Sequence, residues 1–186
     1  MATHAEPVRL ALRKLWSDHV IWTREYIVAA VDDRPDAGEA ANRLLRNQDD
    51  LGAAIVPYYG QAAGTALASL LRDHIMIAVD LVAAAKGEDD AAFQKHDARW
   101  TENAHQIAGF LAGANPNWPE QDVFDLLSLH LKLTKDEAVA RLTREYAADV
   151  KAFDDIFTEI MVLADALHDG LVAQFPERFG KVAVPA

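Results

Sequence analysis

Hydrophobic residues recur at intervals of three and four along most of the chain, which is the spacing of one face of an α-helix. Short segments rich in proline, glycine, asparagine or acidic residues separate these stretches and are typical of turns. No segment shows the apolar–polar alternation of a β-strand. The pattern predicts an all-α, up-and-down bundle of about six helices, at residues 7–33, 36–56, 61–86, 89–113, 120–142 and 144–174.

Three of these helical stretches carry a histidine in the middle of the apolar stripe. The two intervals that separate His19, His74 and His130 differ by only one residue. Such regular spacing is typical of an internal repeat, and short turns make consecutive helices antiparallel neighbours. We therefore expect one domain, residues 1–186, built from three repeated antiparallel hairpins. The repeat units are at about 8–57, 61–116 and 120–176.

The second helix of each expected hairpin carries a polar residue at a related position. Asn47 precedes His74 by the same number of residues as Asn103 precedes His130, and Glu159 takes the corresponding place in the last unit. Counting along helices that rise about 1.5 Å per residue puts each of these residues within about one turn of its histidine's level. If the hairpins share an axis, one core layer contains three imidazoles, two amides and one carboxylate.

Such a layer has the chemistry of a metal site. Neutral imidazoles bind zinc and iron, and a carboxylate can supply a fourth ligand. We expect a divalent metal ion, zinc or iron, held by His19, His74, His130 and Glu159. Asn47 and Asn103 would hydrogen-bond the outer ring nitrogens, as residues around metal ligands do. An open coordination position could bind a small ligand or activate water, but no substrate or reaction can be named.

Two further polar residues lie on the histidine stripes. Tyr26 and Glu137 stand two helical turns after His19 and His130, respectively, and would make one side of the layer polar. Glu137 could act as an extra ligand or as a proton acceptor. None of the four remaining histidines has a counterpart in the repeat, and we expect three of them at the surface: His4, His105 and His168.

A structural interpretation of the same histidines is the alternative. A histidine on an inward face is usually a core residue that bonds a nearby carbonyl or hydroxyl, because an unpaired buried polar group costs about 1–3 kcal/mol. Each histidine could bond its own hairpin partner, His19 with Asn47 for example, without the three meeting. The protein would then be a non-enzymatic structural or interaction protein.

Composition restricts the partners. The 186 residues are 51% hydrophobic and 25% charged, and 18 basic against 29 acidic residues give a net charge of −11. Such a chain repels nucleic acids and anionic membranes and suits a basic partner or a homo-dimer. The absence of cysteine from the sequence excludes disulfides and thiolate ligands, and it fits a cytoplasmic protein. The N-terminus has no signal-peptide pattern, and no segment has the consistent apolar character of a membrane span.

Several short motifs together resemble a bacterial family of all-helical proteins with repeated L-x-x-x-H hairpins: DHVIWTR, LLRDHIMIA, NPNW, HLKLT and QFP. The resemblance extends over most of the chain and implies a helical fold, but it implies no particular activity. In general plan the chain is also similar to DinB-like and hemerythrin-like bundles. It departs from them in having no H-x-x-x-H or H-x-x-x-E on the three histidine-bearing helices.

Overall fold

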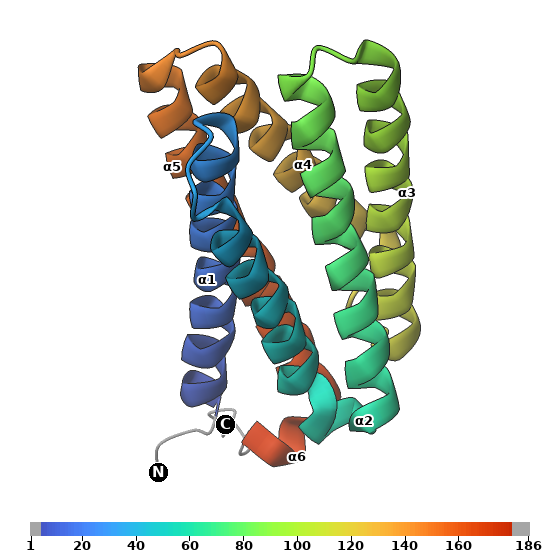
Figure 1. Cartoon of the computed structure of the whole chain (residues 1–186). Helices are drawn as coiled ribbons and strands as arrows, with labels where there is room; N and C mark the ends of the chain where they lie inside the picture. The colour runs from blue at the N-terminus through green and yellow to red at the C-terminus, as the bar shows by residue number, and fades with distance from the viewer. Residues whose placement is uncertain (1–4, 180–186) are drawn as a thin grey trace.

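The computed structural model of the protein describes residues 5–179, and over this range it confirms an all-α, up-and-down bundle. Helices that are consecutive in sequence pack side by side, and α1 also packs against α5, which closes the bundle (Figure 1). The described helices are α1 (Ala5–Val31), α2 (Ala37–Lys86), α3 (Asp90–Ala114), α4 (Glu120–Leu142), α5 (Tyr146–Gln174) and the short α6 (Pro176–Phe179).

The long helix α2 takes the place of two helices that were expected at residues 36–56 and 61–86. A single non-helical residue, Gly60, with φ 83° and ψ 169°, interrupts it and follows Pro57 by three residues. This left-handed φ favours glycine, which has no Cβ. The chain reverses direction at this kink, so the two segments of α2 belong to different hairpins (Figure 1). The expected four-residue turn is therefore wrong, although the expected change of direction is correct.

The three turns that follow α1, α2 and α4 have the same backbone form. Each contains a non-glycine residue with positive φ, namely Asp33, Glu88 and Arg144, and these residues are separated by the same two intervals as the histidines. In each turn the amide of the next residue donates to a carbonyl five residues back, as in a Schellman-type helix end. The bonds are Arg34 to Ala29, Asp89 to Ala84 and Glu145 to Ala140.

The core is formed by apolar side chains from all five long helices, and the loop between α3 and α4 is fixed to it by Asn115. This residue is fully buried, and its amide donates to the Tyr59 hydroxyl at 3.0 Å and to the Gly170 carbonyl at 2.9 Å. The loop is thereby joined to the kink of α2 and to α5. Core residues include Leu12, Leu51, Leu71, Ile107, Leu127 and Ile160.

Candidate functional site

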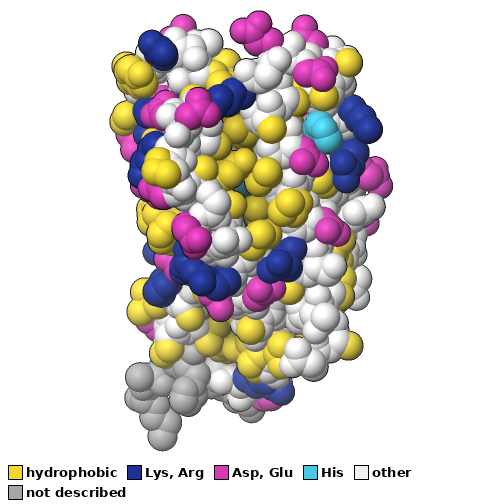
Figure 2. Space-filling view, in the orientation of Figure 1, with side chains coloured by type: hydrophobic (Ala, Val, Ile, Leu, Met, Phe, Trp, Pro, Cys, Tyr) yellow, Lys and Arg dark blue, Asp and Glu magenta, His cyan; other side chains and the backbone are white. Residues whose placement is uncertain are grey.

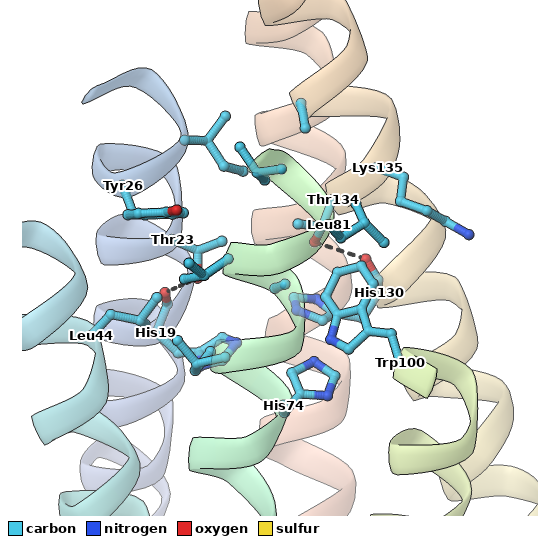
Figure 3. A pocket seen from close by; sticks show the side chains of 16 residues that line it. His19, Thr23, Tyr26, Leu44, His74, Leu81, Trp100, His130, Thr134 and Lys135 are labelled. Carbon is cyan, nitrogen blue, oxygen red and sulfur yellow. Dashed lines mark hydrogen bonds between the residues drawn. The ribbon is translucent and has the colours of Figure 1, made fainter. Parts of the chain in front are cut away.

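The three repeated histidines lie in the interior and line one cavity. His19, His74 and His130 are only 2%, 3% and 3% exposed, respectively. α1 supplies the first, the second segment of α2 supplies the second, and α4 supplies the third (Figure 3). The ring centres of His19 and His130 are 5.5 Å apart. Figure 2 shows hydrophobic side chains gathered around a hollow on this face of the molecule.

Two of the histidines are held through Nδ1 by a side chain of the following helix. Asn103 Oδ1 lies 2.7 Å from His74 Nδ1, and Glu159 Oε2 lies 3.1 Å from His130 Nδ1. The Asn103 amide nitrogen donates to the Leu70 carbonyl, so its oxygen must accept from His74. His74 therefore carries the proton on Nδ1, which leaves the lone pair on Nε2. The Glu159 oxygen faces Nδ1 of His130 in the same way, which matches the same tautomer for that ring.

His19 is held differently. Its Nδ1 is buried and has no hydrogen-bond partner in the described part of the chain. The expected partner, Asn47, donates to the Leu15 carbonyl at 2.9 Å instead, and its oxygen accepts from Gln48. The bonds of His74 and His130 to their own hairpin partners are therefore those of the structural interpretation. The His19–Asn47 bond that it also expected is wrong.

Burial keeps the imidazoles of His19 and His74 uncharged. It lowers the pKa of His19 well below its usual value of 6.5, and the nearby His130 and His74 lower it further. Burial, and to a smaller extent His130, lowers the pKa of His74 to about 3, although the bond to Asn103 opposes this shift. At neutral pH both rings are neutral, which is the form that binds a metal ion.

The cavity is small and has few free polar groups. The space open to the centre of a water molecule is about 20 Å³, enough for one water or one metal ion and too little for an organic substrate. Thr23 and Thr134 line it, but their hydroxyls donate to the carbonyls of His19 and His130. Tyr26 also lines it, and burial raises the pKa of its hydroxyl.

The expected ligand set is only partly brought together. The cavity lining includes the three histidines and Tyr26, whereas Glu159 contacts the Nδ1 side of His130 and also lines a groove between α4 and α5. Within residues 5–179, no group of three or more histidine or acidic side chains has the arrangement needed to hold a metal ion. Binding of one ion by all three imidazoles would therefore require the rings to rearrange.

Glu137 belongs to a different cluster. Its side chain is 1% exposed and accepts a hydrogen bond from Arg24 at 2.5 Å, and the same guanidinium nitrogen donates to Asp149 at 2.7 Å. Burial raises the pKa of Glu137 to about 7, while Arg24 opposes the shift. The sequence pattern did not reveal Arg24 and Asp149, because they lie on α1 and α5 and no local motif connects them with Glu137 on α4.

The other histidines differ in their burial. His105 is exposed and stacks on Phe124, as expected for a surface residue. The expectation for His168 is wrong, because it is 6% exposed and its ring nitrogens contact Asp169 and the Ala5 carbonyl. His4 lies outside the described residues.

Comparisons with known proteins identify no relative. No protein-family model matches the chain, and neither the curated proteins nor the solved structures gave a match. Across the described helices, none combines the length and the apolar character that crossing a bilayer requires.

Proposed function

We propose that the protein binds one divalent metal ion, zinc or iron, through His19, His74 and His130. The observation that carries the proposal is that three buried imidazoles from three different helices line one cavity of ion size. Two of them are fixed through Nδ1, which leaves Nε2 as the lone-pair nitrogen. This is the usual arrangement of metal-binding histidines, whose second ring nitrogen donates to a carbonyl or a carboxylate.

Glu159 and Asn103 have outer roles in this proposal. Glu159 accepts a hydrogen bond from His130 Nδ1, which makes that imidazole a more basic metal ligand and places a negative charge near the cation. Asn103 orients His74 in the same way without adding charge. This assignment replaces the ligand role that was expected for Glu159. Glu137 has no part in the proposed site, because its carboxylate is bonded by Arg24, which also bonds Asp149.

Three imidazole ligands leave one coordination position for water or a small ligand. A zinc ion held in this way lowers the pKa of a bound water to about 7. Tyr26, Thr23 and Thr134 border the cavity and would be the nearest polar groups to that position. The size of the cavity restricts any ligand there to a few atoms. The proposed function is therefore the binding of a metal ion with an open position for a small ligand.

The second candidate is a structural or interaction protein without a metal. It is favoured by the hydrogen bonds of His74 and His130 to their own hairpin partners, and by the absence, within residues 5–179, of histidine and acidic side chains arranged to hold a metal ion. A homo-dimer or a basic partner would suit its net charge of −11. Metal binding by the purified protein separates the two candidates.

The test is a calorimetric titration of chelator-treated protein with zinc and with iron(II). We expect the wild type to bind one equivalent and His74→Ala to bind at least about tenfold more weakly, since one of three ligands is lost. His105→Ala removes an exposed histidine outside the cavity and should bind like the wild type. Circular dichroism verifies that each variant folds. A folded wild type that binds no metal, or equal binding by His74→Ala, would support the structural candidate.

A further inference from the structure

Residues counted from the positive-φ residue of each hairpin turn can be compared between the three hairpins. Each histidine precedes the positive-φ residue of its turn by the same number of residues. The two observed Nδ1 partners, Asn103 and Glu159, also share one separation from the turns that precede them. The residue at that separation after Asp33 is Gln48. Asn47, which resembles Asn103 in residue type, is therefore one position out of register.

Asn103 both accepts and donates a hydrogen bond in the second hairpin, whereas two residues share these roles in the first hairpin. In the second hairpin, Asn103 accepts from His74 and donates to the Leu70 carbonyl, four residues before that histidine. In the first hairpin, Asn47 makes the equivalent donation to the Leu15 carbonyl, four residues before His19. The oxygen of Asn47 is already engaged by Gln48, so the acceptor for His19 must come from elsewhere.

Gln48 has the required free acceptor. It is fully buried, and its amide nitrogen donates to the Leu44 carbonyl at 2.8 Å and to Asn47 Oδ1 at 3.1 Å. Both donors of the amide are used, so its orientation is fixed and Oε1 can only accept. Oε1 is buried without a partner among residues 5–179, and so is His19 Nδ1. Gln48 also acts on the pKa of His19, which it raises against the larger lowering effect of burial.

We propose that Gln48 is the third positioning residue and accepts a hydrogen bond from His19 Nδ1. The bond would join two buried polar atoms that otherwise lack partners, and an unpaired polar atom is unfavourable in a protein interior. All three imidazoles, which line the shared cavity (Figure 3), then carry the proton on Nδ1 and the lone pair on Nε2. The inference deepens the proposed function and rests on it only for what those lone pairs bind.

The tautomer of His19 is the direct test. Long-range proton–nitrogen NMR on the full chain, labelled with nitrogen-15 at histidine and freed of metal by chelator, distinguishes Nδ1–H from Nε2–H rings. We expect Nδ1–H for His19, His74 and His130 in the wild type. Gln48→Met keeps the length of the side chain but removes the acceptor, and should shift His19 toward Nε2–H while leaving the other two rings unchanged. Gln48→Glu should restore the wild-type tautomer.

Gln106→Met, a matched substitution at an exposed position of α3, should change none of the three rings. An Nε2–H tautomer of His19 in the wild type would overturn the inference, since Nδ1 would then accept, for example from the nearby Trp16 indole. An unchanged His19 signal in folded Gln48→Met would overturn it too. The wild-type spectrum decides the matter even if that variant does not fold. A protein with the expected tautomers that binds no metal would contradict only the proposed function.

Discussion

A buried histidine has two ring nitrogens, and the partner of one decides what the other can do. Asn103 and Glu159 accept hydrogen bonds from Nδ1 of His74 and His130, which fixes the orientation and the tautomer of both rings. The two partners differ in charge, because only Glu159 is a carboxylate. This difference makes the contribution of charge to the proposed site measurable at the level of single residues.

The first prediction concerns Glu159→Gln. Glutamine keeps an acceptor for His130 Nδ1 but removes the negative charge, so we expect weaker zinc binding by about 10- to 100-fold with little change in fold. The affinity is measured by competition with a chromophoric chelator. Asp155→Asn removes a partly exposed carboxylate one helical turn away and serves as the control. Equal losses in both variants would show that general surface charge, and not Glu159, controls the affinity.

The second prediction concerns the buried charges of Arg24. Its guanidinium contacts Glu137 and Asp149, whose side chains are 1% and 2% exposed. Arg24→Met leaves two buried carboxylates without this cation and should lower the free energy of unfolding by about 3–5 kcal/mol. Arg34→Met removes an exposed pair with Asp36 and should cost less than about 1 kcal/mol. Urea unfolding measures both, and similar losses would contradict a structural role for the Arg24 cluster.

At the scale of elements, the two segments of α2 approach each other closely at Gly52 and Gly64. A Cβ atom on Gly52 would lie 2.5 Å from the Gly64 carbonyl oxygen and 2.7 Å from Ala68 Cβ. Only glycine leaves room for this contact between backbones. The close approach sets the angle between the segments, and through it the positions of Leu44 and His74 in the cavity wall.

The third prediction follows from this contact. Gly52→Ala should lower the free energy of unfolding by about 1–3 kcal/mol, because the backbone atoms must separate. Gly38, in the first turn of α2, has no atom within 4 Å of the position that a Cβ would take, so Gly38→Ala should be neutral or stabilising by up to about 1 kcal/mol. Chemical denaturation measures both variants. A neutral Gly52→Ala would mean that the segments are not in close contact.

The kink also shows what the sequence can specify about an element. Pro57 and Gly60 correctly marked the change of direction, because both residues disfavour a straight helix. They did not reveal that a single residue with positive φ is enough to make the turn. Side-chain packing between the segments, including the Gly52–Gly64 contact, determines this and depends on residues that are far from the turn motif.

At the scale of the whole molecule, the nearly equal intervals between the histidines placed all three in one core layer on the condition that the hairpins share an axis, and in the structure the three side chains line one cavity. The partner of His19 could not be found by residue type. Asn47 resembles Asn103, but a shift of one residue rotates a side chain by about 100° around a helix. The Arg24 cluster was likewise hidden, since it joins three helices whose rotation only tertiary packing fixes.

The fourth prediction concerns the pH dependence of folding in chelator-treated protein. His19 and His74 stay neutral in the fold but protonate near pH 6.5 when unfolded, so each lowers stability as pH falls below that value. Each contributes a slope of roughly 1.4 kcal/mol per pH unit. Glu137, whose pKa is raised from 4.5 to about 7, has the opposite effect between those values. The histidines outnumber it, so stability should fall from pH 6.5 to 4.5.

The same experiment contains its own control. Glu137→Gln removes the opposing titration and should make the loss of stability with falling pH steeper. Urea unfolding at several pH values gives both slopes. If the stability of the wild type increased as the pH fell from 6.5 to 4.5, the histidines would not be neutral groups in a buried cavity.

An anomalous diffraction map of zinc-loaded crystals would show whether three histidines from three helices hold one metal ion. Zinc suits the experiment even if iron is the natural metal, because nitrogen sites generally bind zinc more tightly than iron(II). We predict one peak in the cavity, about 2.0–2.1 Å from Nε2 of His19, His74 and His130. A cavity without a peak, in crystals whose zinc is bound only by surface carboxylates, would contradict the proposed metal site.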